Sequence, residues 1–491
     1  MIRYCWVKSQ GRAAPCRCFF TICQQEVGVA ENMSAQGQGD TLEAYGYKQE
    51  FRRVLKLRHL VAYGLAYVTP TAPFPMLGII AIVSMGHLAA VYVVAFVALF
   101  FTATSYAKMA ARHPIAGTAY SYTQQAIHPH VGFVIGWALF MSYVLVPLLS
   151  VIAARDLCVQ IAPQVPSWIW IVAFVVFMTA INFFGIKVTT RANAIMTVAM
   201  ILAAVLFVIL AIIALASGVG EGVILSTKPF YHPATFNTSL ILAGASIGIF
   251  SYIGFDGVST LAEEVENPRV NIGRATVLVA LFCAVIFVIV AYLSQMVWPD
   301  YNGLPRDVSA VLLISERIGG SFFRYFVFLI MIVAAVSCAL AAQVSAARLM
   351  YGMGRDGVLP KKFFSYVSPK HKIPTYNLLL IAAISLAFPS LMNFETAAMV
   401  LNYGAFLGFF AVNLSVIFEY VIRHRQDELG PVEIWRFIIM PVLGMIIIGK
   451  IFLSLDTAVL KWVTLWMVFG LTYYGILTSG FRKVIKIKIE E

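Results

Sequence analysis

The chain has 491 residues, of which 60% are apolar and 12% are charged, and its mean hydropathy is +0.85. An average soluble protein is about half apolar and about a quarter charged, so this composition excludes a protein that is wholly soluble in water. The formal net charge of +12 does not indicate nucleic-acid binding, because the basic residues form no patch and lie between apolar stretches.

Apolar stretches long enough to cross a bilayer recur along the chain. A membrane-spanning helix needs about 20 mainly apolar residues, and a membrane barrel would instead alternate polar and apolar residues. We therefore predict an all-α polytopic membrane protein with twelve transmembrane helices, in contact with membrane lipid. The predicted spans are 59–83, 88–111, 128–155, 167–185, 193–217, 240–262, 273–297, 322–350, 376–392, 396–422, 432–455 and 459–480.

The distribution of basic residues predicts the orientation in the membrane. With the N-terminus in the cytoplasm, 28 of the 35 Lys and Arg residues fall on the cytoplasmic side and six on the opposite side. Cytoplasmic loops of membrane proteins carry an excess of Lys and Arg. We therefore predict a multi-pass protein of the cytoplasmic membrane, with both termini, including the basic tail 481–491, in the cytoplasm.

The first 45 residues differ from the rest of the chain. Four of the seven cysteines precede Met33, but no CxxC pair or neighbouring His accompanies them, so we predict no metal site. A polar stretch follows Met33. We predict that residues 1–45 are disordered or that translation begins at Met33 rather than at Met1.

Two predicted spans contain residues that interrupt a helix. In span 59–83, three prolines lie between Pro70 and Pro75, where they remove backbone donors and clash with preceding carbonyls. In span 240–262, several glycines surround Asp256, an acid near the middle of the membrane. A single break of this kind is often a kink or a packing feature.

Breaks in the first and sixth spans indicate an internal repeat. The sixth span lies five spans after the first, which is the spacing of two five-helix inverted repeats, here 46–217 and 240–423. In such proteins the broken helices meet near the midplane, where unwound backbone binds the substrate. The sequence therefore favours a transporter. A channel would show a repeated filter or rings of charge, and an enzyme a nucleophile with a base or a metal cluster.

Five segments carry a family resemblance. They are Phe250 to Pro268 (FSYIGFDGVSTLAEEVENP), Ala347 to Pro360 (ARLMYGMGRDGVLP), Gly64 to Pro70 (GLAYVTP), Ala116 to Tyr122 (AGTAYSY) and His128 to Trp137 (HPHVGFVIGW). Over about residues 50–480 the chain resembles amino acid–polyamine–organocation permeases, and among them bacterial putrescine importers. The resemblance implies the five-plus-five fold with two extra helices, at 432–480, and secondary transport of amino acids or amines.

The substrate is predicted from a departure from this family pattern. In putrescine importers an acid follows the Phe of the first break and another precedes the Tyr of the third span, whereas here Pro75 and Ser142 stand at these positions. A dication needs compensating carboxylates in a low-dielectric site. We therefore predict import of a small molecule with one amino group and one carboxylate, with a putrescine or polyamine importer and an amino acid exchanger as the alternatives.

The candidate binding residues lie at the two breaks and on the third span. At the breaks they are Thr69, Thr71, Ala72, Phe74, Tyr252, Gly254, Phe255 and Asp256. On the third span, Tyr143 and Trp137 offer aromatic rings that would wall the site.

The coupling ion is predicted on family grounds to be a proton, with no other cofactor. Glu263 and Glu264 follow the second break, where they either take part in gating and proton exchange or are solvated at the membrane interface. Some relatives use a lysine in the fifth helix in place of a sodium ion, and the matching position here is Met200. Ser337 and Ser345 offer hydroxyls for a sodium site.

Overall fold

The computed structural model of the chain describes residues 50–51, 53–369, 371–423, 430–455 and 459–483. Residues 1–45 and the tail from 484 onward lie outside the described residues, so the predictions made for them stay predictions. Within the described ranges the chain forms helices and one isolated parallel bridge, between Leu55 and Val265.

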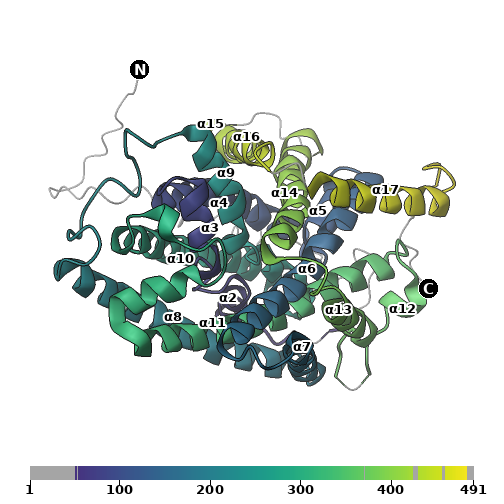
Figure 1. Cartoon of the computed structure of the whole chain (residues 1–491). Helices are drawn as coiled ribbons and strands as arrows, with labels where there is room; N and C mark the ends of the chain where they lie inside the picture. The colour runs from purple at the N-terminus through teal and green to yellow at the C-terminus, as the bar shows by residue number, and fades with distance from the viewer. Residues whose placement is uncertain (1–49, 52, 370, 424–429, 456–458, 484–491) are drawn as a thin grey trace.

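The helices pack as one bundle, in which segments distant in the sequence lie side by side (Figure 1). In chain order they are α2 (Leu57–Val68), η2 (Phe74–Met76), α3 (Leu77–Val83), α4 (Leu88–Arg112), α5 (Thr118–Ala126), α6 (Pro129–Ile161), α7 (Ser167–Phe183), α8 (Ile186–Ala216), α9 (Thr238–Gly248), η3 (Ile249–Tyr252), η4 (Asp256–Glu264), α10 (Pro268–Val297), η5 (Tyr301–Gly303), α11 (Ala310–Arg355), α12 (Lys361–Phe364), α13 (Thr375–Ala387), α14 (Phe394–Ile417), η6 (Phe418–Arg423), α15 (Pro431–Ile434), η7 (Trp435–Ile439), α16 (Met440–Phe452) and α17 (Leu460–Leu477).

Nine helical segments in the described ranges are long and apolar enough to cross a membrane. The other three predicted spans form shorter helices: 59–83 is divided into α2, η2 and α3, while α7 has 17 residues and α13 has 13. The prediction of an all-helical multi-pass protein is confirmed. The count of twelve crossings stays a prediction.

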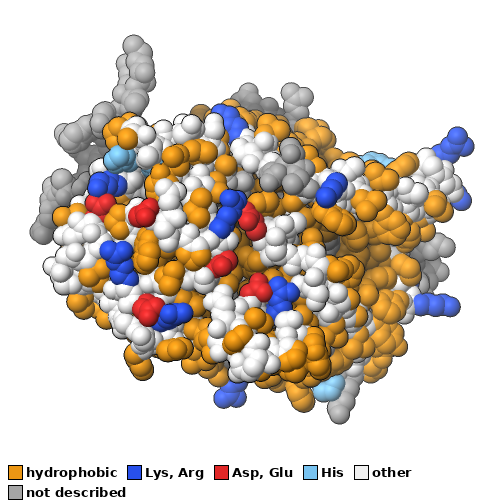
Figure 2. Space-filling model, in the orientation of Figure 1, with side chains coloured by type: hydrophobic (Ala, Val, Ile, Leu, Met, Phe, Trp, Pro, Cys, Tyr) orange, Lys and Arg blue, Asp and Glu red, His pale blue; other side chains and the backbone are white. Residues whose placement is uncertain are grey.

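The surface of the bundle is rich in large apolar side chains. Hydrophobic side chains cover much of the face shown in Figure 2. Leu202 on α8 is 64% exposed and Phe322 on α11 is 85% exposed. Contact of so much apolar surface with water would be unfavourable, whereas lipid chains solvate it without cost. The outward faces of these helices are therefore suited to the bilayer interior.

The first predicted break is confirmed. Helix α2 ends at Val68, and Thr69 adopts φ 60° and ψ 124°, a left-handed φ that is rare outside glycine. Pro70 and Pro73 follow, and a short 3-10 turn, η2, leads into α3. The prolines thus interrupt the helix where their missing donors and ring clashes require it.

The second predicted break is also confirmed. Helix α9 tightens into the 3-10 turn η3, and Ile253 is extended with ψ 133°. Gly254 follows with φ 120°, which only glycine adopts readily. The chain then resumes as η4 from Asp256. The acid therefore lies at the start of the second half of the broken segment.

One predicted boundary is wrong. Residues 298–321 were expected to form a loop before a span at 322–350, but α11 already begins at Ala310. The backbone leaves the helical region only at Gly319 and Gly320, where Gly320 has φ 71°. The segment before these glycines is a short helix at an angle to the long one, because the two glycines permit a sharp change of direction.

Contacts between helix ends define two sides of the bundle. We call the end at which α2 begins the N side and the opposite end the far side. On the N side, the end of α4 contacts η6 through an ion pair between Arg112 and Glu419. On the far side, the end of α6 contacts the segment after α13, since Arg155 donates a hydrogen bond to the carbonyl of Pro389.

Candidate functional site

A cavity lies beside the break between α2 and η2. Its volume is about 80 Å³. It is lined by Tyr67, Val68, Thr69, Thr71, Ala72, Pro75, Val146, Ser150, Ala153, Leu157, Phe250, Ile253, Met331, Ala334, Ala335, Cys338 and Phe394. Both broken segments contribute to it, and so do α6, α11 and α14. None of these side chains carries a charge, so the cavity suits a ligand whose side chain is neutral.

The polar groups of the cavity come mainly from the first break. Thr71 is 2% exposed, and its hydroxyl has no hydrogen-bond partner within the described residues. A buried hydroxyl without a partner costs free energy, and a bound polar ligand would remove that cost. The strained backbone of Thr69 adjoins it. Strain and an unsatisfied group at one place are features of functional sites.

The first break supplies three of the predicted residues to the cavity, namely Thr69, Thr71 and Ala72. Phe74 does not line it. The ring of Phe74 instead packs 5.3 Å from that of Phe207 on α8.

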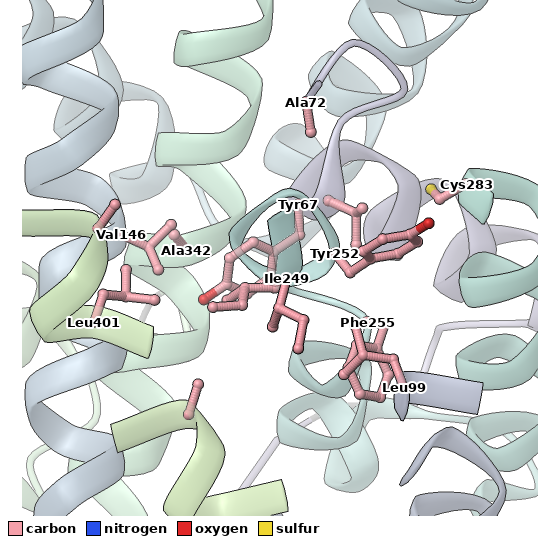
Figure 3. Close-up of a cluster of buried hydrophobic side chains, with 14 of the residues drawn as sticks. Tyr67, Ala72, Leu99, Val146, Ile249, Tyr252, Phe255, Cys283, Ala342 and Leu401 are labelled. Carbon is pink, nitrogen blue, oxygen red and sulfur yellow. The ribbon is translucent and has the colours of Figure 1, made fainter. Parts of the chain in front are cut away.

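The predicted residues of the second break do not line the cavity. Figure 3 shows two of them, Tyr252 and Phe255, in the cluster of buried hydrophobic side chains. The hydroxyl of Tyr252 donates a 3.1 Å hydrogen bond to the carbonyl of Tyr92. The ring of Phe255 packs 5.7 Å from that of Tyr106. Gly254 provides the backbone turn already described. In this conformation the second break contributes Phe250 and Ile253 to the cavity, in place of the residues that the sequence indicated.

Asp256 and Tyr143 form a buried pair. The phenol of Tyr143 donates a 2.6 Å hydrogen bond to Asp256 Oδ2, and the two residues are 4% and 3% exposed. Within the described residues, no basic side chain forms an ion pair with Asp256. A buried carboxylate without a positive partner is costly, so a cationic ligand group would bind favourably beside it. The sequence predicted both residues, and the structure brings them together.

Trp137 lies away from both the cavity and this pair. Its ring stacks 4.7 Å from that of Trp466, and its Nε1 donates a 2.9 Å hydrogen bond to the carbonyl of Trp466 on α17. A reciprocal bond runs from Trp466 Nε1 to the carbonyl of Trp137. Trp137 therefore joins α6 to α17 and does not wall the site.

Pro75 and Ser142, the two positions at which the resemblance implied acids, lie in different surroundings. Pro75 lines the cavity, so an acid there would face a ligand. Ser142 faces α14, where its hydroxyl donates a 2.6 Å hydrogen bond to the carbonyl of Leu401. Neither position gives this chain a carboxylate in the cavity.

Glu263 and Glu264 are buried in ion pairs, so their interpretation as solvated interface acids is wrong. They are 2% and 3% exposed. Arg348 Nε on α11 donates a 2.5 Å hydrogen bond to Glu264 Oε1. Arg355 Nη1 donates a 2.9 Å hydrogen bond to Glu263 Oε1, which also accepts the N–H of Ala116. Because a guanidinium group pairs with each carboxylate, the exit of η4 is tied to the end of α11.

The segment before α2 closes the N side further. The N–H groups of Val54 and Leu55 donate to the carbonyl of Glu264 at 2.9 and 3.0 Å. The guanidinium of Arg348 lies 5.4 Å from the ring centre of Phe51. Phe51 and the backbone of Val54 and Leu55 thus cover the ion pair of Glu264 and Arg348. The N side is closed by ion pairs and backbone hydrogen bonds. The cavity lies beside the half of α6 that is nearer the far side.

The contact between α8 and the first break was not predicted from the sequence. Met200 packs among apolar residues, with Ala203 and Ile330. A second residue of α8, Asn193, is linked to the end of α2 through Ser337, whose hydroxyl donates a 3.4 Å hydrogen bond to Asn193 Oδ1. The same hydroxyl lies 3.4 Å from the carbonyl of Ala66. The only indication of this contact in the sequence is that a polar residue, Asn193, precedes a run of apolar residues.

Comparison with known proteins shows the family of the chain. The amino acid permease family matches residues 59–477. The low-affinity putrescine importer PlaP of Escherichia coli (strain K12) is 33% identical over 89% of this chain and 96% of its own length. The branched-chain amino acid permease BcaP of Bacillus subtilis (strain 168) is 27% identical over 91% and 97%, respectively. The chain therefore belongs to the amino acid permease family, and it is a membrane transporter.

Proposed function

We propose that the protein imports a small neutral amino acid across the cytoplasmic membrane by alternating access. The observation that carries this proposal is the uncharged cavity at the first break, with the hydroxyl of Thr71 in its wall, which has no hydrogen-bond partner among the described residues. Apolar side chains of α6 and α11, such as Val146 and Met331, form most of the remaining wall. They suit the aliphatic side chain of an amino acid.

The two charged ends of an amino acid would be held by different groups. The hydroxyl of Thr71 suits the carboxylate, whereas the N–H groups of Thr69, Ala72 and Phe74 already donate to nearby carbonyls. The ammonium suits free carbonyls at the breaks and, once it reaches the pair below the cavity, the carboxylate of Asp256. The single carboxylate of Asp256 balances one ammonium group. This charge balance favours an amino acid over a diamine.

A putrescine importer is the second candidate. It is favoured by the identity of 33% with PlaP, which is higher than the identity of 27% with BcaP. Against it, a diamine would place its second ammonium in a cavity that no acid lines. The two candidate functions thus differ in the transported substrate, which a transport assay measures directly.

The membrane arrangement is part of the same proposal. We infer twelve crossings in two inverted repeats, 46–217 and 240–423, followed by two extra helices at 432–480. The N side faces the cytoplasm, because Lys and Arg collect there. Proton symport is proposed as the driving mode, with Glu263 or Glu264 exchanging the proton. Amino acid exchange is the alternative to symport.

Transport into proteoliposomes decides between the substrates. Purified protein is tested side by side with labelled leucine, valine and putrescine, and liposomes without protein are the control. Saturable uptake of a neutral amino acid, with no competition by putrescine, is the expected result. Saturable putrescine uptake that amino acids do not inhibit would reject the proposal in favour of the second candidate.

Two further measurements test the mechanism. Unlabelled substrate trapped inside the liposomes accelerates uptake of label in a carrier but not in a channel. A pH-sensitive dye inside the liposomes reports acidification when substrate enters with a proton. If Glu263→Gln and Glu264→Gln both keep wild-type acidification and pH dependence, neither acid exchanges the proton.

A further inference from the structure

The ring of Tyr67 separates the cavity from the buried pair of Asp256 and Tyr143. Tyr67 lines the cavity and is 1% exposed. Its ring centre lies 6.4 Å from that of Tyr143, at an interplanar angle of 83°. Figure 3 shows Tyr67 near the centre of the close-up, with Ala72 of the first break above it. The ring of Tyr67 therefore lines the cavity and also contacts Tyr143, which does not line it.

Two glycines of the second break form a slot for this ring. A β-carbon added to Gly254 would lie 2.7 Å from Tyr67 Cδ2, and one added to Gly257 would lie 2.5 Å from Tyr67 Cδ1. Carbon atoms in contact are about 3.5–4.0 Å apart, so any larger residue would displace the ring. The slot consists of glycine backbone, so no side chain of these two residues holds the ring in place.

Residues of α11 show how far the cavity extends on each side of the Tyr67 ring. Cys338 lines the cavity, whereas Ser345, seven residues later, does not. Seven residues of an α-helix span about 10 Å. Ser345 lies on the N side of Tyr67, where its hydroxyl is 2.8 Å from the hydroxyl of Tyr63. The ring thus closes a path that continues toward the N side beyond the cavity.

We propose that Tyr67 is a movable floor that a substrate must displace to pass from the cavity to Asp256. The cavity is then the first of two positions for the substrate, and the pair of Asp256 and Tyr143 is the acidic part of the second. The identity of the substrate rests on the proposed function. The floor itself is a property of the protein and is open to measurement without any substrate.

The test measures access to a cysteine placed beneath the floor. Ser345→Cys is introduced into a variant whose seven native cysteines are replaced by serine, and vesicles with the far side outward receive a membrane-impermeant thiol reagent. With Tyr67 present we expect slow labelling. With Tyr67→Ala we expect labelling to be at least tenfold faster. Tyr67→Leu, a smaller truncation, gives the same direction of change where the alanine variant does not fold.

Two matched variants separate the floor from a general loosening of the cavity. Tyr67→Phe keeps the ring and removes only the hydroxyl, so labelling stays slow. Met331→Ala widens the same cavity from α11 without touching the slot, and labelling again stays slow. Fast labelling in either control shows that loose packing, and not loss of the floor, exposes the cysteine, and overturns the proposal.

The outcome for the floor is independent of the outcome for the substrate. Equal labelling of the Tyr67→Ala variant and its parent overturns the floor, whichever compound is transported. Faster labelling in a protein that takes up putrescine and no amino acid keeps the floor and rejects the proposed substrate. The two failures are therefore distinguishable.

Discussion

Loss of the ion pair between Glu264 and Arg348 is expected to open the N side. Both side chains are 3% exposed, and they join the exit of η4 to α11. Removing one partner of a buried pair leaves an uncompensated charge and costs about 3–5 kcal/mol. The cost falls on the closed N side, since the remaining charge becomes hydrated when that side opens. A cost of about 3 kcal/mol shifts the balance of the two states about 150-fold.

The assay is thiol labelling from the N side. Ser345→Cys is placed in the cysteine-free variant, and inside-out vesicles are treated with the impermeant reagent. We expect Glu264→Gln to raise the labelling rate at least tenfold and to raise the KM for uptake, because fewer molecules expose the cavity to the far side. The double variant Glu264→Gln with Arg348→Gln removes the uncompensated charge, so its labelling rate falls back toward that of the parent.

Two results would refute this reasoning. One is an unchanged labelling rate and KM in Glu264→Gln, which would mean that the pair stabilises both states equally. The other is a double variant that labels faster than either single variant, since the cost would then not come from an unpaired charge. Glu316→Gln is the matched control, because its pair with Arg324 is exposed and on the far side.

Four further outcomes are expected. Substrate should slow alkylation of Cys338 in the otherwise cysteine-free protein, and equal rates with and without substrate would place the substrate elsewhere. Thr71→Val should weaken substrate binding about tenfold, as for a lost hydrogen bond to a charged group, with little change in thermal stability. Tyr143→Phe should reduce the maximal uptake rate at least tenfold, because Asp256 loses its phenol donor. Trp137→Ala should lower the unfolding temperature while the KM for uptake remains at the wild-type value.

The sequence alone was sufficient for the membrane class, most of the spans and the two breaks. These features depend on neighbours in the chain. A run of about 20 apolar residues is stable only in lipid, and prolines interrupt a helix wherever they lie. For the same reason the strained Thr69 and the extended turn at Gly254 occur where proline and glycine indicated. The family was also readable, because its motifs are contiguous segments.

The boundary error at α11 has a local cause as well. The helix from Ala310 is amphipathic and carries charged residues, so its sequence does not look like a span. Two consecutive glycines then mark a change of direction, but glycine alone does not distinguish a loop from a bend between helices. Only the path of the backbone settled which of the two was present.

Tertiary structure decided how the site is assembled. Tyr143 and Asp256 are 113 residues apart, and Glu264 and Arg348 are 84 apart, so no local pattern joins them. Trp137 has the same ring chemistry as a site residue, yet packing against α17 uses it elsewhere. Tyr67 gave no signal of its own, because its role follows from the glycine slot contributed by another helix. A residue's type can be read from the sequence, whereas the partner it meets is set by the packing of the whole bundle.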